Sequence, residues 1–495
     1  MTRANRILDP EPVADLAAYR ALGGGRALEL VDEVGAEAII ATVRDAGIRG
    51  RGGAGFPTGI KWATVAEFSH EERPTIVINA AEGEPGTFKD RAILRTNPYR
   101  TLEGALVAAK VMGSDEVVIA MKDGFEIERA RLERAVAEFA PLVPGITIDI
   151  ATGPASYLFG EETAMLEVLE GRPPFPRVTP PYRRGIEPGG ETHSSSDVEL
   201  TGDEETGGEA ALVDNVETFA NVPLAVVNGP EWFRSVGTEK SPGTIVCTVS
   251  GATERDGVGE FELGTPLAEV IRELGGHVRE GANLLAVLNG VSNAPIRLEH
   301  LAVRLTYEDF AAIGSGLGSA SFIVLSDQDS AVDAAAEVAR FLAVESCGQC
   351  TACKGDAVAI AERLGAWHEL ARYDDENREA IAAALTTVTD GARCALATQT
   401  QTVVGALLAM APATPVRVRR SLHIGPALDL VDEVLMVDDN ERRKRPDWSM
   451  ASSTTEIVED GLEAWPAQLA SDGTWRFSEE HGHEWVTRRT TSRAR

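Results

Sequence analysis

Four of the five cysteines in this 495-residue chain gather around one short motif. Cys347, Cys350 and Cys353 follow one another at C-x2-C-x2-C spacing, and Cys394 stands apart further along the chain. Three thiolates on one turn, completed by a remote fourth, are typical ligands of a 4Fe-4S cluster. The spacing therefore predicts one-electron transfer.

Other interpretations of the cysteines stay open at this point. Four thiolates also suit tetrahedral zinc, although structural zinc sites usually pair two C-x2-C knuckles. A disulfide is a further alternative, but nothing in the sequence indicates a secreted protein. Cys247 lies in an apolar run and is predicted to be a small buried residue. Lys354 follows the third cysteine, and we expect it to be exposed; the alternative is that its charge raises the potential of a cluster.

A glycine-rich loop is the second feature that could take part in chemistry. The segment 50–55 reads GRGGAG and satisfies G-x-G-x-x-G. A dinucleotide fingerprint of that form must leave a strand and enter a helix, whereas this loop follows the helical pattern of residues 35–47. Its glycines still allow backbone N–H groups to approach a phosphate, with Arg49, Arg51 and Lys61 supplying charge. A surface loop without a ligand is the alternative.

Composition limits the classes of partner. The net charge of −30 argues against nucleic acid and against direct binding to an anionic bilayer. The N-terminal residues contain no apolar segment typical of a secretion signal, and the longest apolar stretch, near 403–411, is too short to span a membrane. We expect a cytoplasmic protein that reaches a membrane only through partner subunits.

Alternating strands and helices must position these residues. Apolar runs at 75–79, 116–121 and 146–150 are predicted to be buried strands, and helical patterns at 102–112 and 126–139 lie between them. This alternation predicts a mainly parallel, Rossmann-like α/β domain. Short strands around one helix at 266–274 predict a β-grasp-like module, and the pattern beyond residue 330 is helical.

A chain of this length is typical of several domains. We therefore expect an N-terminal extension at 1–34, an α/β domain at 35–239 with an acidic insertion at 186–209, a β-grasp-like domain at 240–326, a helical domain at 330–425 that carries the clustered cysteines, and a C-terminal tail at 426–495.

Several segments together resemble one family. They are GRGGAGFPTGIKW at 50–62, NAAEGEPGTFKD at 79–90, GEETA at 160–164, NVET at 215–218 and the cysteine set. Taken in this order, they resemble the FMN-bearing, NADH-binding 51-kilodalton subunit of respiratory complex I and the flavin subunits of NAD-linked hydrogenases and formate dehydrogenases. The resemblance covers roughly residues 30–425.

The resemblance implies an activity, cofactors and partners. NADH would pass a hydride to FMN, and electrons would then leave singly through a 4Fe-4S cluster to a partner subunit. The implied partners are a separate small subunit with a 2Fe-2S cluster and a larger electron-transfer complex, because no cysteine-bearing extension precedes residue 30.

The resemblance also implies roles for individual residues. The acids beside the nicotinamide are Glu84 and Glu162, and Phe56 matches an aromatic residue that stacks on the adenine. The remaining cofactor contacts are Gly50, Gly52, Gly53, Gly55, Lys61, Asn79, Glu82, Tyr157, Gly160, Glu161, Asn215 and Thr218. The cluster ligands are Cys347, Cys350, Cys353 and Cys394. Without the resemblance, the acids at 161–162 would be interpreted as a helix N-terminal cap.

Three departures from the family pattern motivate an alternative function. Ala81 stands where the family usually has Asp, Asp214 replaces the first Asn of an Asn-Asn pair, and the insertion at 186–209 replaces an adenine-binding segment. A flavin and iron–sulfur relay that no longer uses NADH is therefore the alternative. A ligand-binding role for the β-grasp-like region is a third hypothesis.

Overall fold

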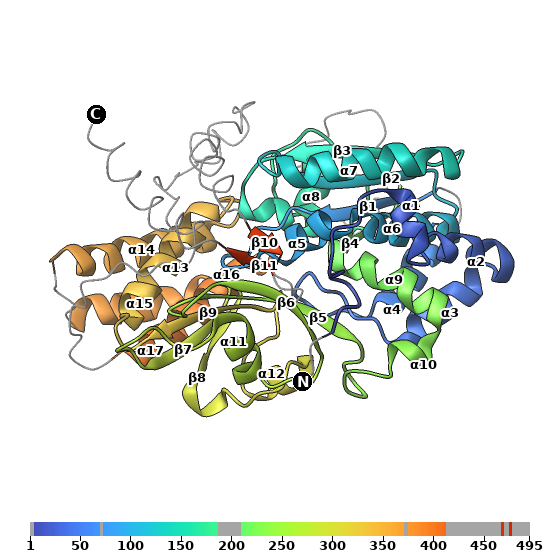
Figure 1. The fold of residues 1–495 in the computed structure, drawn as a ribbon. Helices are drawn as coiled ribbons and strands as arrows, with labels where there is room; N and C mark the ends of the chain where they lie inside the picture. The colour runs from blue at the N-terminus through green and yellow to red at the C-terminus, as the bar shows by residue number, and fades with distance from the viewer. Residues whose placement is uncertain are drawn as a thin grey trace, which may run out of the picture. The chain divides into compact units, whose positions relative to one another are not determined.

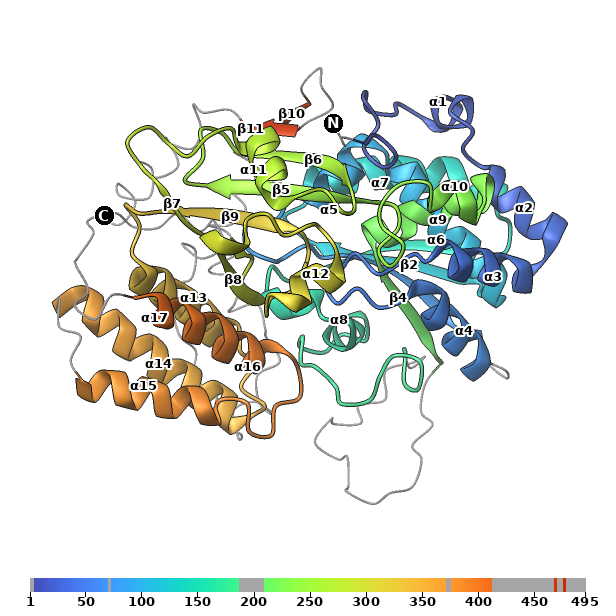
Figure 2. The same ribbon diagram turned by 90° about the horizontal axis from the view of Figure 1, so that it is seen from below.

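The computed structural model describes residues 4–69, 73–186, 209–370, 375–411, 467–469 and 475–477. The chain divides into two compact units. The first unit contains Arg6–Glu82 and Asp90–Thr244, and the second contains residues 4–5, Gly83–Lys89 and the described residues from Ile245 onward. Figure 1 and Figure 2 show the elements of both units in two views.

A four-stranded parallel sheet forms the centre of the first unit. Its strands are β1 (Thr75–Ala80), β2 (Glu116–Lys122), β3 (Thr147–Gly153) and β4 (Ala211–Asn215), in the order β3-β2-β1-β4. The three predicted strands coincide with β1, β2 and β3 within a few residues. The prediction of a parallel α/β fold is confirmed.

Helices surround this sheet. They are α1 (Leu16–Ala21), α2 (Arg26–Val34), α3 (Ala36–Ala46), α4 (Thr58–Phe68), α5 (Lys89–Thr96), which begins at the boundary of the units, α6 (Pro98–Met112), α7 (Glu126–Phe139), α8 (Glu162–Leu169), α9 (Val216–Asn228) and α10 (Pro230–Phe233), with 3-10 turns η1 (Ala140–Leu142) and η2 (Tyr157–Gly160). Helices α6 and α9 pack on β1, whereas buried residues of η2 and α8 pack with Val77, Ala120 and Val213. Because successive strand residues face opposite sides, the sheet is covered on both faces.

Helices α6 and α9 approach closely at one glycine. A Cβ atom added to Gly104 would lie 2.0 Å from the carbonyl oxygen of Phe219. Pro223 lies inside α9 and has no N–H, so it leaves that same carbonyl without its usual intrahelical donor. Glycine is therefore required where α6 faces the carbonyl.

A buried carboxylate fixes the N-terminal helices to the first unit. Glu103 of α6 accepts hydrogen bonds from the Tyr19 hydroxyl, from Gly25 N at 2.8 Å and from Ala27 N at 2.9 Å. Gly25 is the N-cap of α2 and has no side chain to satisfy these amides. Glu103 therefore caps α2 from another helix.

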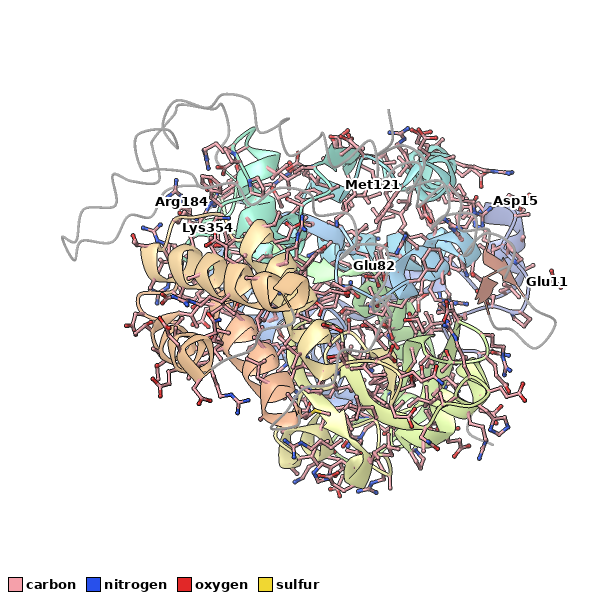
Figure 3. All side chains as sticks on the ribbon, turned by 90° about the vertical axis from the view of Figure 1, so that its left-hand side faces the viewer. Glu11, Asp15, Glu82, Met121, Arg184 and Lys354 are labelled. Carbon is pink, nitrogen blue, oxygen red and sulfur yellow. The ribbon has the colours of Figure 1, made fainter. Side chains whose placement is uncertain are left out.

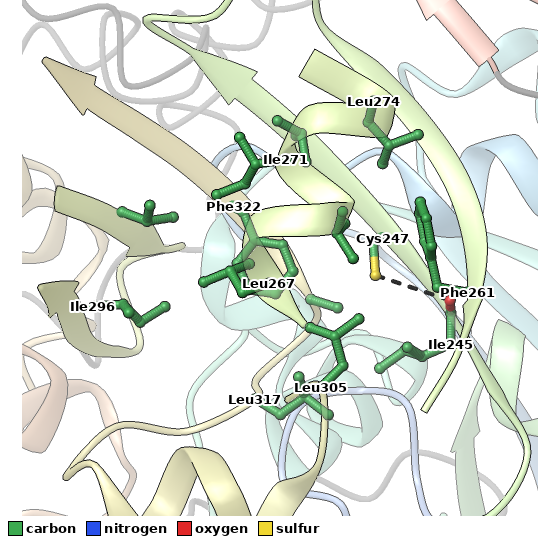
Figure 4. Close-up of a cluster of buried hydrophobic side chains, with 14 of the residues drawn as sticks. Ile245, Cys247, Phe261, Leu267, Ile271, Leu274, Ile296, Leu305, Leu317 and Phe322 are labelled. Carbon is green, nitrogen blue, oxygen red and sulfur yellow. Dashed lines mark hydrogen bonds between the residues drawn. The ribbon is translucent and has the colours of Figure 1, made fainter. Parts of the chain in front are cut away.

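The second unit contains a mixed sheet around one helix. Its strands are β5 (Thr244–Gly251), β6 (Gly257–Glu262), β7 (Leu284–Asn289), β8 (Asn293–Arg297) and β9 (Ser321–Ser326), with β10 (Ala467–Leu469) and β11 (Trp475–Phe477) added at the edge of β6; its helices are α11 (Leu267–Gly275), α12 (Tyr307–Ala312) and η3 (Leu298–His300). These five strands follow the order β6-β5-β9-β7-β8, with β5 and β9 parallel, and the β-grasp-like assignment of this region stays a prediction. The core lies between this sheet and α11, and includes Phe261, Leu267, Phe322 and the fully buried Cys247, as predicted (Figure 4).

The remaining elements of the second unit are helical. They are α13 (Ala331–Glu345), α14 (Thr351–Leu370), α15 (Asp375–Thr387), α16 (Leu396–Gln399), the π-helical turn η4 (Thr400–Val404) and α17 (Gly405–Met410). Helix α13 packs on α14, and α14 packs on α15. The predicted acidic insertion, apart from its two flanking residues, and most of the predicted tail lie outside the described residues. Among those described, no helix is both long and apolar enough to cross a membrane.

Candidate functional site

The carboxyl ends of β1 and β4 form the candidate cofactor site of the first unit. From β1 the sheet extends through β2 to β3 on one side, and the chain then returns to place β4 on the other side of β1. Ligands of open parallel sheets bind at such a reversal point. Asn79 and Asn215 are paired across it, and Asn79 Nδ2 donates to Gly160 O at 2.8 Å. Three predicted site residues from distant segments are thus brought together.

The glycine loop lies beside this reversal point. It connects α3 to α4, as the sequence predicted, and Gly50 N donates to Phe56 O at 2.8 Å. Gly53 and Gly55 have φ values of 126° and 64°, which side chains other than glycine rarely adopt. A Cβ atom added to Gly52 would lie 3.5 Å from Asn215 Cβ. The loop therefore presents main chain next to the end of β4, which fits a phosphate-bearing cofactor such as FMN.

Arg51 of the loop has a different role from the one the sequence suggested. Arg51 is 1% exposed, and its guanidinium donates to Arg49 O and Thr244 O, each at 2.9 Å. Its Nε lies 3.7 Å from a carboxylate oxygen of Glu217, which is also buried. The expectation that Arg51 supplies charge to a phosphate is wrong, because this side chain is directed into the protein interior. The main-chain N–H of Arg51 donates to the hydroxyl of the buried Thr218 at 2.9 Å. Arg51 and Thr218 therefore fix the position of the glycine loop.

Lys61 joins α4 to the other elements of the site. Its Nζ donates to Glu162 Oε1 at 2.6 Å and to Val213 O, and it lies 3.6 Å from Asp214 Oδ1. The other oxygen of Asp214 accepts from Trp62 Nε1 at 3.1 Å. Asp214, expected to place a negative charge near the flavin, is therefore paired with a cation.

The pKa values of this pair reflect both burial and charge. Burial raises the pKa of Asp214 above its ordinary value, with Lys61 opposing the rise. Burial alone would lower the pKa of Lys61, but Asp214 and Glu162 reverse this effect and hold it above its usual value. The ammonium is therefore positively charged at neutral pH, at the carboxyl end of β4.

Glu161 caps the helix that carries Glu162. Its carboxylate accepts from Thr163 N at 3.1 Å, Ala164 N at 2.8 Å and the Thr163 hydroxyl at 2.7 Å. Burial raises the pKa of Glu161, and these hydrogen bonds oppose the rise. The structure thus confirms that Glu161 is the N-cap of α8. Tyr157 and Gly160 form the turn η2 immediately before the cap, and the predicted cofactor roles of all three residues remain predictions.

Two further acids, Glu82 just after β1 and Asp90 in the first turn of α5, are held by hydrogen bonds. Glu82 accepts from Arg91 Nε and from Asp90 N, each at 2.9 Å, and its side chain is buried. Asp90 in turn accepts from Asn215 Nδ2 at 2.7 Å. These bonds fix the orientation of the Asn215 amide at the site.

Glu84 and Phe56 lie in different surroundings. Glu84 belongs to the second unit, where its Oε1 accepts from Val291 N at 2.6 Å in the turn between β7 and β8. Phe56 is 53% exposed, as a side chain available for stacking would be. The proposed nicotinamide role of Glu84 and the adenine role of Phe56 are both left as predictions.

The cysteine motif spans the turn between α13 and α14, which holds Cys347 and Cys350, and the first turn of α14, which holds Cys353. The Ser346 hydroxyl lies 3.4 Å from Cys353 Sγ, and Gln349 Nε2 donates to Cys347 Sγ at 3.5 Å. Arg393, next to Cys394, donates to Gln349 Oε1 at 3.1 Å. This link brings the segment of the fourth cysteine to the triplet.

The cysteine surroundings differ from the sequence expectation at one residue. Lys354, which is labelled in Figure 3, is 5% exposed rather than exposed. Its ammonium donates to main-chain carbonyls at the end of α13. Burial raises the pKa values of Cys347 and Cys353. In the described part of the chain, no three His, Cys, Asp or Glu side chains converge closely enough to hold a single metal ion. The four-thiol donor set suits an iron–sulfur cluster.

A cavity of about 560 Å³ lies at the opposite edge of the parallel sheet. Its lining includes Thr75, Glu116 and Thr147, together with Asp115, Ile186 and Glu209. Because Thr75, Glu116 and Thr147 are the first residues of β1, β2 and β3, the cavity is separate from the reversal point.

Fold and site together define a flavin-type α/β protein joined to an iron–sulfur module. Residues 43–224 match the Nuo51 FMN-binding domain, and residues 333–413 match the NADH-ubiquinone oxidoreductase-F iron-sulfur binding region. The chain is 35% identical over 353 residues to an NADH-quinone oxidoreductase subunit of Rhizobium meliloti (strain 1021), covering 68% of this chain and 79% of that protein. The chain belongs to the family of the 51 kDa subunit of complex I.

Other relatives agree with this assignment. The chain is 36% identical over 333 residues to the mitochondrial NADH-ubiquinone oxidoreductase 51 kDa subunit of Neurospora crassa (strain ATCC 24698 / 74-OR23-1A / CBS 708.71 / DSM 1257 / FGSC 987), with 64% of each chain covered. A solved structure of an NAD+-reducing [NiFe]-hydrogenase in its H2-reduced state is similar with a TM-score of 0.67 and 31% identity. That similarity covers 77% of this chain and 63% of the hydrogenase chain. The predicted family, fold class and cofactors are confirmed, and the iron–sulfur match decides against zinc.

Sequence reasoning missed the residues that support the site. Asp90, Gln349 and Arg393 orient or link predicted site residues, and Arg177 N donates to the Thr163 hydroxyl that binds Glu161. Their types carried a weak signal, since each is a polar residue within or near a motif. The partners of Asp90 and Arg393 lie far away in the sequence.

Proposed function

We propose that this chain is the electron-input subunit of an NADH:acceptor oxidoreductase. The main support is that a single chain combines an FMN-binding domain with a four-cysteine iron–sulfur region. The glycine loop of the FMN-binding domain lies at the reversal point of a parallel sheet. When bound, FMN accepts a hydride from NADH and the cluster carries single electrons onward.

The chain's own residues would bind and orient these groups. Main-chain N–H groups of Gly52, Gly53 and Gly55 would hold the FMN phosphate, while Gly50, whose N–H donates to Phe56 O, would let the backbone pass close to the cofactor. The amides of Asn79 and Asn215 would orient the flavin ring. Lys61, charged and held by Glu162 and Asp214, would place positive charge at the ring edge. Tyr157, Gly160, Glu161, Glu82 and Thr218 would complete the cradle, and Glu84 and Phe56 would contact the nicotinamide and adenine ends of NADH.

The four cysteines would ligate the cluster as thiolates. The bond from Gln349 to Cys347, and the contact of Ser346 with Cys353, would offset part of the ligand charge. Hydrogen bonds of this kind to cluster sulfur atoms influence the potential of iron–sulfur proteins.

Partners and location complete the proposal. A separate small 2Fe-2S subunit of the 24 kDa type would receive electrons within a larger complex, on the cytoplasmic side of a membrane. The support is that the relatives named above are subunits of NADH-quinone and NADH-ubiquinone oxidoreductases.

Anaerobic titration tests the activity. The purified chain should show flavin and iron–sulfur absorbance, and NADH should bleach the flavin and support ferricyanide reduction. A Cys394→Ser variant should keep NADH-dependent flavin bleaching while losing the 4Fe-4S electron paramagnetic resonance signal. Protein that retains FMN but gives no bleaching with NADH would refute the dehydrogenase function and favour the relay that no longer uses NADH.

A further inference from the structure

Lys354 is a buried cation next to the cysteine motif. Its Nζ donates to Ala343 O at 2.6 Å, to Ser346 O at 2.9 Å and to Val344 O at 3.5 Å. The side chain is 5% exposed, and the residue directly follows Cys353 in the first turn of α14. Burying a lysine costs free energy unless its ammonium is hydrogen-bonded or interacts with negative charge.

The carbonyls that bind Lys354 form the end of α13. The last carbonyl groups of a helix have no intrahelical donor and carry a partial negative charge. Lys354 supplies donors from the following helix, so a single side chain ties the end of α13 to the start of α14. The turn between these two ends contains Cys347 and Cys350.

The charge of Lys354 also reaches the cysteine sulfur atoms. Lys354 directly follows Cys353, and its ammonium donates to the carbonyl oxygen of Ser346, the residue before Cys347, at 2.9 Å. An ammonium that stabilises negative charge on these sulfur atoms also stabilises the additional negative charge that arises when the site takes up one electron.

We propose that Lys354 is a positioning residue that raises the reduction potential of the cluster. It does so by adding a fixed positive charge and by neutralising the negative end of α13 that the cysteine turn would otherwise face. The inference rests on the proposed cysteine ligand set. One electron enters the cluster, supplied by dithionite in the test below, and no proton accompanies it.

The expected size follows from Coulomb's law. A unit charge at about 10 Å, in surroundings with an effective dielectric constant of about 20, changes an equilibrium constant by about tenfold. For a one-electron couple, tenfold corresponds to about 59 mV. Removal of the charge should therefore shift the potential by about this amount toward more negative values.

A redox titration of the full chain, followed by electron paramagnetic resonance with dithionite and mediators, tests the proposal. Lys354→Met removes both charge and donors, Lys354→Gln keeps an amide donor without the charge, and Lys354→Arg keeps the charge. Lys240→Met removes an exposed lysine of the first unit and is the matched control. We expect lower potentials for the Met and Gln variants, and potentials close to the unsubstituted protein for the Arg and control variants.

Two results would overturn the inference. One is a neutral variant that holds its cluster at the unsubstituted potential. The other is loss of the cluster from both neutral variants but not from Lys354→Arg, because Lys354 would then act in assembly. Absence of any 4Fe-4S signal from the unsubstituted protein would instead refute the ligand set, which distinguishes failure of the proposed function from failure of this inference.

Discussion

Replacing Arg51 with methionine should strongly destabilise the first unit. The guanidinium is 1% exposed, donates to two main-chain carbonyls and faces the buried carboxylate of Glu217. Removing one partner of a buried ion pair typically costs about 3–5 kcal/mol, because a charge is left in a low-dielectric interior. Arg51→Met should therefore lower the free energy of unfolding by about this amount.

Arg49→Met is the matched comparison. Arg49 also donates to the loop main chain, at 2.7 Å from Nε to Gly55 O, but it is only partly buried. Loss of one such bond should cost about 1 kcal/mol. The double variant Arg51→Met, Glu217→Gln should recover part of the loss, since the buried charge is then removed as well.

Urea denaturation followed by tryptophan fluorescence measures these changes, because Trp62 of the first unit is fully buried. FMN affinity gives a second readout. Arg51 N binds the Thr218 hydroxyl under the glycine loop, so a displaced loop should weaken FMN binding by tenfold or more, or at least about 1.4 kcal/mol. If Arg51→Met costs no more than Arg49→Met, the assignment of a buried structural ion pair to Arg51 is incorrect.

Three further substitutions test the packing and electrostatics. Gly104→Ala should lower stability by about 1–3 kcal/mol in thermal unfolding, since the added Cβ would overlap Phe219 O; an unchanged midpoint would contradict the close helix contact. Burial raises the pKa of Asp256 to about 6, so the folded carboxyl binds its proton more tightly than the unfolded one and stability falls as the pH rises from about 4 to about 6. Asp256→Asn should remove this contribution and raise the free energy of unfolding at pH 7 by up to about 3 kcal/mol; an unchanged slope between about pH 4 and about pH 6 would count against it. Glu103→Ala should cost about 1–3 kcal/mol by leaving the α2 amides unsatisfied, with faster proteolysis N-terminal to α3, and equal proteolysis rates would reject this capping role.

The sheet of the first unit could be predicted because the sequence pattern that marks each strand is local. The runs at 75–79 and 116–121 are apolar, short and separated by helical patterns, so their type and parallel direction followed from periodicity. The cysteine spacing was equally local. Motif residues such as Asn79 and Gly160 also meet where the sheet topology required a ligand site.

The surroundings of charged residues could not be predicted in the same way. A lysine after a cysteine is usually solvated, and Lys354 is buried only because the end of α13 offers carbonyls within its reach. Arg51 was interpreted as a phosphate contact because its neighbours in the sequence are glycines. Its actual partners, Thr244 and Glu217, are remote in the sequence and could be identified only from the folded chain.

The short segment Gly83–Lys89 affects how the protein folds during synthesis. Its flanking residues belong to the first unit, yet Glu84 binds Val291 and Phe88 N donates to Thr248 Oγ1 in the second. During synthesis, about two hundred further residues must leave the ribosome before Glu84 meets its partner. Contacts of such long sequence separation form slowly. A fragment ending at Thr244 would contain this segment without the strands that bind it, so Glu84 would lack its main-chain partner at Val291.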